Sequence, residues 1–233
     1  MERYSIITEK NPREIVLLRG FGCKWRKCRF CDYHLDFSKN AKDNFLLNRS
    51  VLDKVTGCYG KLEVINSGSF CELDADTREY IKEICFLKKI SEIHFESHYM
   101  YKDLIPALRM EFAEIGVKVK VKIGVETFER EFRENVMLKG IDEDDPAVIA
   151  ENFNEVCLLF GLTGQTVETM KSDIETGLAN FERVCINIMV ENTTKVRPDT
   201  GVIEKFIREI YPVYKDDERV DILLENTDFG VGA

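Results

Sequence analysis

The strongest chemical signal in the chain is a group of three cysteines near its start. Cys23, Cys28 and Cys31 lie within nine residues, separated by four and then two positions. Thiolates at such spacings can wrap one metal centre, and Gly20 and Gly22 allow the backbone to bend tightly around it. Three thiolates suit a 4Fe–4S cluster in which one iron stays open for a small-molecule ligand.

Two other interpretations of this group remain open. His34, three residues after Cys31, could complete the four ligands of a zinc-stabilised interaction module. A non-catalytic iron–sulfur sensor would use the same three cysteines. Basic side chains interleave with the thiols and would offset the negative charge of a thiolate-bound cluster: Lys24, Arg26, Lys27 and Arg29.

The other five cysteines are scattered along the chain. They are Cys58, Cys71, Cys85, Cys157 and Cys185. Three of them, Cys85, Cys157 and Cys185, fall in apolar stretches, where a thiol behaves as a small buried hydrophobic group. We therefore expect these three to be buried thiols, whereas Cys58 and Cys71, which lie beside glycine-rich turns, receive no such assignment.

Strand-like and helical segments alternate along the chain. The strand-like segments are 14–19, 61–66, 92–96, 117–125, 156–160 and 184–190. Helical patterns cover 76–89, 104–115, 128–138, a segment from Pro146, 167–179 and 200–210, and 220–224 begins a strand-like tail. This alternation predicts an α/β fold with a parallel sheet. Six units are too few for an eight-stranded barrel, so we expect a partial (βα)6 parallel barrel. It would form one domain over 1–233, with a core of about 14–190 and a C-terminal helix and tail at 191–233.

Composition excludes several classes of protein. The chain has 233 residues, of which 44% are hydrophobic and 32% charged, and this balance excludes a disordered chain. A net charge of −9 argues against a protein that mainly grips phosphate backbones. No apolar run approaches the roughly 20 residues that span a bilayer, and the start lacks the pattern of a signal peptide. We expect a cytoplasmic protein with no membrane partner.

The motifs together resemble the radical S-adenosylmethionine (radical SAM) superfamily. The resemblance covers about residues 14–190 and rests on the cysteine loop after the first strand, with Phe30 before its last cysteine. It also rests on Asn66-Ser-Gly-Ser69, on Gly124-Val-Glu-Thr127 followed by Leu138-Lys-Gly140, and on Gly161-Leu-Thr-Gly-Gln-Thr166. The four-then-two spacing departs from the commoner three-then-two pattern. Membership implies that a 4Fe–4S cluster cleaves SAM to a 5′-deoxyadenosyl radical.

The resemblance implies a role for each motif. Cys23, Cys28 and Cys31 would hold the cluster. Phe30 would pack near the adenine of SAM, and Ser67, Gly68 and Ser69 would meet its amino end. Ser97 and Glu126 suit the ribose or amino group, and Lys139 suits the carboxylate. The backbone of Gly161, Leu162 and Thr163 would line the adenine.

The expected substrate is a small molecule, because the chain has little beyond the core and no second cysteine group. The Asn66–Phe70 loop resembles that of radical SAM lyases acting on 7-deazaguanines. We expect a lyase that cleaves the C–N bond of queuine and releases 7-aminomethyl-7-deazaguanine, a step of queuine salvage. Another small molecule or a tRNA base is the alternative.

Carboxylates at strand ends, Glu72 among them, could accept the N–H edge of such a base. The candidate substrate residues are Asn66, Glu96, His98, Asn187, Glu191, Glu225, Asp228 and Phe229. The resemblance also implies an external electron donor such as flavodoxin or ferredoxin. Direct binding of nucleic acid is not expected.

Overall fold

The structure is a computed structural model that describes residues 2–224, and within them one eight-stranded sheet has its strands in chain order. The strands are β1 (Tyr4–Ile7), β2 (Arg13–Leu18), β3 (Lys61–Asn66), β4 (Glu92–Glu96), β5 (Lys118–Glu126), β6 (Glu155–Phe160), β7 (Arg183–Ile188) and β8 (Val220–Leu223). Strand β1 is antiparallel to β2, whereas β2 to β5 and β6 to β8 pair in parallel.

Helices fill most of the connections between the strands. The α-helices are α1 (Ala41–Leu52), α2 (Ala75–Leu87), α3 (Ile105–Ala113), α4 (Pro146–Ala150), α5 (Val167–Asn180), α6 (Thr200–Glu209) and α7 (Tyr211–Tyr214). Short 3-10 helices cover Tyr33–Leu35, Phe70–Glu72 and Tyr99–Leu104, and a π-helix covers Phe132–Val136. No helix in the described part of the chain is long and apolar enough to cross a membrane.

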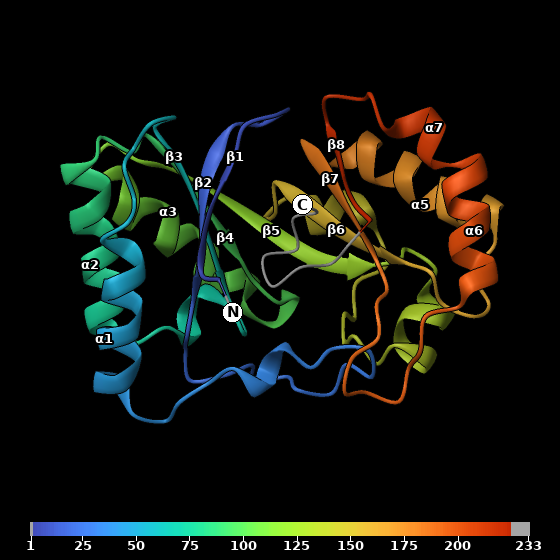
Figure 1. Ribbon diagram of the computed structural model, residues 1–233, viewed down its shortest axis with the longest axis horizontal. Coiled ribbons are helices and arrows are strands. Elements are labelled where there is room, and N and C mark those ends of the chain that lie inside the picture. Colours follow the sequence, from blue (N-terminus) through green and yellow to red (C-terminus); the bar gives the residue numbers. More distant parts are fainter. Residues whose placement is uncertain (1, 225–233) are drawn as a thin grey trace. The chain divides into compact units, whose positions relative to one another are not determined.

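The chain divides into two compact units. Unit 1 comprises residues 2–26 and 33–122, and unit 2 comprises 27–32 and 123–224. In unit 1, helices α1 and α2 pack side by side (Figure 1). Phe95 of β4 packs on Phe112 of α3 with ring centroids 5.5 Å apart, so this face of the sheet is apolar.

The other face of the unit 1 sheet carries charged side chains. Side chains alternate between the two faces along each strand, so every second residue of a strand lies on this face. Glu63 of β3 receives Arg13 Nε at 2.5 Å and also pairs with Lys122, and all three side chains are buried. Burial alone would raise the pKa of Glu63, but Arg13, Lys122 and the nearby His94 hold it well below its usual range. This polar face forms a paired network rather than a hydrophobic core.

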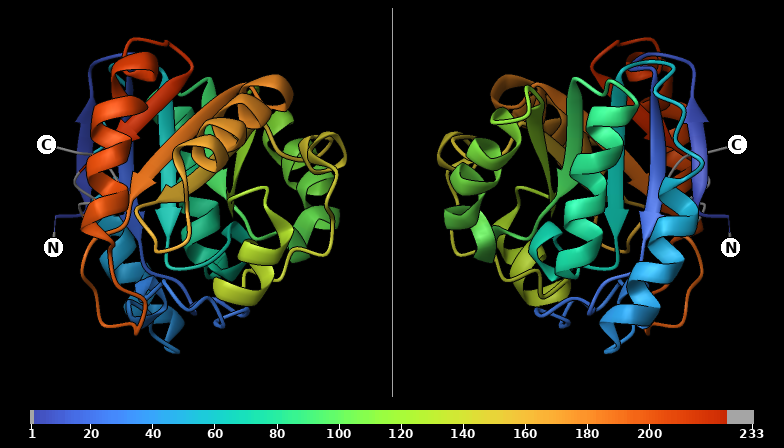
Figure 2. Two further views of the ribbon diagram at one scale, coloured as in Figure 1. Left: turned by 90° about the vertical axis from the view of Figure 1, so that its right-hand side faces the viewer. Right: turned by 90° about the vertical axis from the view of Figure 1, so that its left-hand side faces the viewer.

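Unit 2 is built around strands β6 and β7. Helices α5 and α6 contact each other and strand β6 (Figure 2). Gly177 permits close packing of α5, because a Cβ there would lie 2.8 Å from Val184 Cγ2 on β7. Phe160 of β6 and Phe206 of α6 are fully buried, with ring centroids 5.8 Å apart.

The six predicted parallel strands are confirmed as β2 to β7, and the strand-like tail is β8. Strand β1 and helices α1 and α7 were not predicted. Helix α1 lacks an apolar stripe because its buried face carries Asn44 and Asn48, whose Oδ1 atoms accept hydrogen bonds from Arg19. The helix predicted over 128–138 is instead mainly the π-helix Phe132–Val136.

Candidate functional site

The loop that follows β3 in unit 1 is tightly built. Ser69 Oγ accepts a hydrogen bond from the backbone N–H of His98 at 2.9 Å, and Asn66 Nδ2 donates to Ser69 O at 3.2 Å. Gly68 leaves no space for a side chain, since a Cβ there would collide with the Glu72 carboxylate and lie 3.2 Å from Cys23 Cα. Within the described residues, Asn66 Oδ1 and Ser67 Oγ are buried without a hydrogen-bond partner. Such groups are costly unless a ligand or water satisfies them.

Glu72, at the end of the 3-10 helix Phe70–Glu72, binds both this loop and the segment that carries the three cysteines (residues 20–32, the cysteine segment). Its Oε2 accepts from Ser69 N at 2.6 Å, and its Oε1 accepts from Lys24 N at 2.6 Å and from Tyr101 Oη at 3.0 Å. Burial and the Glu72 charge raise the pKa of Tyr101 well above its usual range, so the phenol remains a donor. Glu72 therefore serves protein donors, and its predicted availability to substrate is not supported by these contacts.

An aromatic pair lies beside the same segment. The rings of Trp25 and His98 stack with centroids 5.4 Å apart and planes 22° apart. His98 Nδ1 also accepts a hydrogen bond from Met100 N at 3.1 Å. His98 was predicted as a substrate residue, and the structure shows that it also packs on the cysteine segment of unit 1.

The second part of the cysteine segment, residues 27–32, is held within unit 2. Arg29 N donates to Met137 O at 3.0 Å, just beyond the π-helix. Asn192 Nδ2 donates to Phe30 O at 2.7 Å. The backbone N–H and hydroxyl of Thr193 both donate to Asp32 Oδ2 at 3.0 Å. The backbone around Cys28 and Cys31 is thus held at both ends.

Lys139 and Glu126, which were predicted to contact SAM, pair with each other in unit 2. Lys139 Nζ lies 2.7 Å from Glu126 Oε1 and 5.6 Å from the ring centre of Phe30. Burial alone would lower the pKa of Lys139, but the Glu126 charge and the sulfurs of Cys28 and Cys31 raise it above its usual range. Lys139 therefore remains a cation beside Phe30.

The backbone at or next to both residues of this ion pair has a positive φ, a conformation that residues other than glycine rarely adopt. Glu126 has φ of 71° and Leu138, next to Lys139, has φ of 54°. Such conformations cost energy and persist where the surroundings fix them, often at functional sites. Gly124 is tightly confined as well, because a Cβ there would lie 2.9 Å from Lys139 Nζ.

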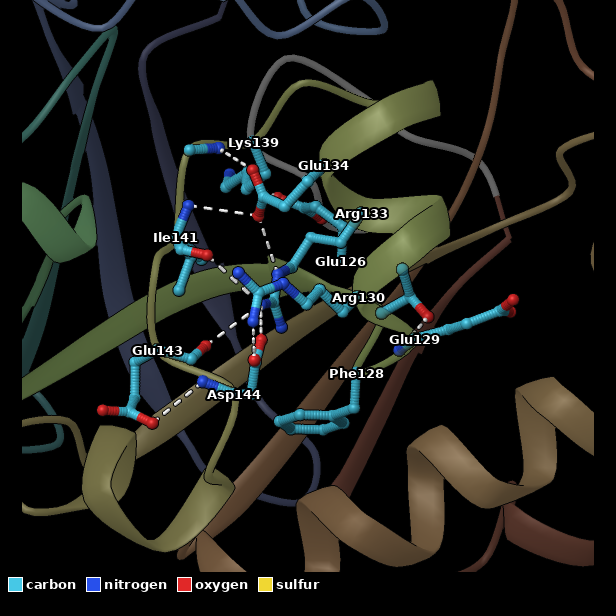
Figure 3. Close-up of polar contacts among 12 residues, drawn as sticks. Glu126, Phe128, Glu129, Arg130, Arg133, Glu134, Lys139, Ile141, Glu143 and Asp144 are labelled. Carbon is cyan, nitrogen blue, oxygen red and sulfur yellow. Dashed lines mark hydrogen bonds and ion pairs between the residues drawn. The ribbon is translucent and has the colours of Figure 1, made fainter.

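A buried arginine fixes the loop that follows Lys139 (Figure 3). Arg133 is 0% exposed, and its Nη2 donates to Ile141 O at 3.2 Å, to Glu143 O at 3.0 Å and to Asp144 Oδ1 at 3.1 Å. Its Nε donates to Glu134 Oε1 at 2.9 Å. Glu134 in turn accepts from the backbone N–H groups of Gly140, at 2.7 Å, and Ile141, at 3.1 Å.

The turn after Glu126 rests on Asp173 of α5. Asp173 Oδ1 accepts from Phe128 N at 2.7 Å. Burial raises the pKa of Asp173 to about 6, although the Phe128 N–H and the Thr127 hydroxyl oppose this rise. The carboxyl thus titrates close to neutral pH while it supports the end of β5.

The turn after β6 contributes further predicted residues. Gln165 folds back over it, accepting from Leu162 N at 2.9 Å and donating to Leu159 O at 2.9 Å. Gly161 has φ of 95°, and Thr163 Oγ1 donates to Asp199 Oδ2 at 2.8 Å. Leu162 belongs to a buried cluster against which Phe30 packs, together with Phe132, Met137, Leu159 and Met189.

The cysteines differ in exposure as the sequence suggested, with two exceptions. Cys23, Cys28 and Cys31 are half-buried, and none of them forms a disulfide. Burial raises the pKa of Cys85 to about 12, as expected for a core thiol, whereas Cys157 and Cys185 are half-buried rather than buried. Among residues 2–224, no three His, Cys, Asp or Glu side chains are arranged around one metal ion. In a cluster, by contrast, each thiolate binds its own iron.

The remaining predicted residues have varied surroundings. Ser97 is buried and donates to His98 O at 3.2 Å, while Glu96 and Asn187 are half-buried on β4 and β7. Glu191 is 71% exposed and pairs with Arg197 at 3.1 Å. The predicted residues Glu225, Asp228 and Phe229 lie outside the described residues.

The supporting residues Arg133, Glu134 and Asp173 were not predicted, and Glu72 was predicted as an acceptor for substrate, whereas in the structure it accepts from protein donors. Glu72 had a signal, because Ser69-x-x-Glu72 is a capping-box pattern. Arg133 and Glu134 had none, since charged residues in a short polar segment usually lie in solvent. Only the fold places Arg133 in the interior, with Glu134 half-buried beside it.

Comparisons with known proteins complete these observations. No family model matches the chain. An uncharacterised protein of Methanocaldococcus jannaschii is 26% identical over 159 residues, and the match covers 60% of this chain and 43% of that protein. The chain thus spans less than half of that curated relative. A solved structure of queuine lyase from Clostridium spiroforme, bound to SAM and queuine, is 46% identical with a TM-score of 0.94, and the match covers 100% of both chains.

Proposed function

The chain belongs to the queuine lyase family of radical SAM enzymes, and from this membership we propose that it cleaves the C–N bond of queuine and releases 7-aminomethyl-7-deazaguanine. The observation that carries the proposal is the full-length likeness to a queuine lyase at 46% identity. The same likeness confirms the predicted fold class, an α/β partial parallel barrel of the radical SAM type.

We propose that Cys23, Cys28 and Cys31 hold a 4Fe–4S cluster. The residues fit this group, because the three cysteines are half-buried and none of them forms a disulfide, and exposed basic side chains flank them in the sequence. When bound, the cluster and SAM supply a carbon-centred radical that removes a hydrogen atom from the substrate. The protein's part is to orient the reactants and to exclude water.

For SAM we propose the residues that the motifs suggest. In unit 1, the unsatisfied hydroxyl of Ser67 and the closely packed Gly68 suit a ligand that approaches the backbone, with Ser69 and Ser97 beside them. In unit 2, Lys139 offers a cation to the carboxylate of SAM, and Glu126 keeps that cation in place. The adenine would rest on Phe30 and the turn formed by Gly161, Leu162 and Thr163.

For queuine we propose polar groups at the strand ends. Asn66 offers a buried oxygen without a partner in the described structure, which suits the N–H edge of a deazaguanine. Glu96, His98 and Asn187 lie at or near the ends of β4 and β7. Glu191 remains a candidate only if its surface pair with Arg197 opens.

An external one-electron donor, such as flavodoxin or ferredoxin, would reduce the cluster. Lys24, Arg26, Lys27 and Arg29 are all exposed, in a chain whose net charge is −9. A local group of cations favours an acidic carrier. Reversing Lys24 to Glu should therefore slow turnover driven by flavodoxin and leave turnover driven by dithionite unchanged.

The proposed reaction can be tested directly. The anaerobically reconstituted protein is incubated with dithionite, SAM and queuine, and the bases are separated and identified by mass spectrometry. We expect 7-aminomethyl-7-deazaguanine only when SAM is present. Intact queuine in a sample whose cluster is loaded and reduced would overturn the substrate and leave the radical SAM family in place.

A further inference from the structure

One carboxylate in unit 1 holds two loops that the proposed function uses. Glu72 Oε1 accepts from the backbone N–H of Lys24, the residue after Cys23, and Oε2 accepts from the backbone N–H of Ser69, both at 2.6 Å. These bonds are short, as expected when a charged acceptor takes part. Glu72 is only 8% exposed, so water screens them weakly.

The main chain of Glu72 strengthens the same connection. Phe21 N donates to Glu72 O at 2.9 Å, so the cysteine segment is bonded to this residue at two points. Gly20 makes the approach possible, because a Cβ there would lie 2.7 Å from Glu72 O. Within the described structure no cation forms an ion pair with Glu72. Its carboxylate accepts instead from the backbone N–H groups of Lys24 and Ser69 and from the Tyr101 hydroxyl.

We propose that Glu72 is a positioning residue that couples the cysteine segment to the Ser67–Ser69 loop. This inference rests on the proposed function, in which the first element holds the cluster and the second binds the amino end of SAM. Because one side chain fixes both, a disturbance of either loop changes the other, and such coupling is reciprocal. Retention of the cluster and affinity for SAM therefore both depend on a side chain that binds neither.

The test is Glu72→Gln, which replaces one accepting oxygen with an amide group that faces a backbone N–H. We expect the cluster-loaded variant to release iron to a chelator about tenfold faster, because a charge-assisted hydrogen bond is lost. By calorimetry it should bind S-adenosylhomocysteine about tenfold more weakly. Glu72→Asp keeps the charge and should show smaller changes in both measurements.

Asp74→Ala is the matched control for a general loss of stability of the folded protein. Asp74 is also a buried carboxylate, but it caps α2 by accepting from Thr77 N at 2.9 Å and from Thr77 Oγ1 at 2.7 Å, and in the described structure it has no hydrogen bond or ion pair with either loop. We expect it to lower the melting temperature and to leave iron release and ligand affinity at their wild-type values.

Three outcomes would count against the coupling. Wild-type values in Glu72→Gln would overturn it. Equal losses in Asp74→Ala would also overturn it, because loss of stability would then explain both effects. A wild-type protein that holds neither cluster nor S-adenosylhomocysteine would refute the proposed function first, and the coupling with it.

Discussion

Unit 1 and unit 2 each contain a buried charged residue that fixes a loop near part of the cysteine segment, but the residue is an acceptor in unit 1 and a donor in unit 2. In unit 1 the Glu72 carboxylate accepts from backbone N–H groups and needs no cation. In unit 2 the Arg133 guanidinium donates to carbonyl and carboxylate oxygens, and Glu134 completes the loop around Gly140. Loss of the Glu72 side chain leaves neutral donors without an acceptor. Loss of Arg133 leaves two carbonyl acceptors without their donor and removes a cation from two partly exposed carboxylates. The first should impair the site and the second should impair folding.

The largest effect is expected from Arg133→Met. The substitution removes the donor of the carbonyls of Ile141 and Glu143. It also removes the cation beside the half-buried Glu134 carboxylate, which keeps the N–H donors of Gly140 and Ile141. Removing one partner of a fully buried ion pair costs about 3–5 kcal/mol, and the partial exposure of Glu134 and Asp144 places the expected loss at the lower end of that range. Urea unfolding should show a loss of this size in the free energy of unfolding.

Arg130→Met is the control for that substitution. Arg130 pairs with the same Asp144, but the two side chains are 59% and 45% exposed. Exposed pairs are worth about 0–1 kcal/mol, so stability should hardly change. If both variants lose the same stability, burial of Arg133 is not what holds the loop.

An intermediate effect is expected from Lys139→Ala, which tests whether the unit 2 loop serves SAM. A lost charge-assisted hydrogen bond should weaken SAM binding by about 1–3 kcal/mol. Calorimetry on the cluster-loaded protein measures this. Unchanged affinity would mean that Lys139 only neutralises Glu126.

The smallest effect concerns Asp173, whose pKa is raised by burial to about 6 from the ordinary 3.8. Between these values the folded state binds the proton more tightly than the unfolded state, so this group makes the protein more stable as the pH falls. From about pH 7 to about pH 5 the gain is roughly 1 kcal/mol.

The Asp173→Asn variant cannot gain stability by taking up a proton at this position, although its amide oxygen can still accept from Phe128 N. The difference between the unfolding free energies of wild type and variant should therefore shift by that amount between the two pH values. A constant difference would place the pKa of Asp173 outside this range.

The sequence predicted the elements whose pattern is local. Strands β2 to β7 are apolar runs between turns, and the cysteine spacing needs no tertiary knowledge. Helix α1 escaped prediction because Asn44 and Asn48 face its buried side, where they bind Arg19. Strand β1 is short and half-buried, so its alternation is weak.

The residues of the site likewise fall into those that a local motif predicts and those that only the folded chain brings together. Lys139 and Glu126 were predicted from a motif, and the structure adds that they form an ion pair. Arg133 could not be predicted, because two of its four acceptors are the backbone oxygens of Ile141 and Glu143, which have no sequence signature. Supporting contacts of this kind depend on the folded chain.

We propose the three-cysteine segment as the catalytic centre of a radical SAM enzyme. The most direct measurement is 5′-deoxyadenosine formed from SAM by anaerobically reconstituted, dithionite-reduced protein, in wild type, Cys28→Ala and Cys58→Ala. Cys58 is a free, exposed cysteine outside the segment. We expect wild type and Cys58→Ala to form 5′-deoxyadenosine and Cys28→Ala to form none; full formation by Cys28→Ala would contradict the role of this segment.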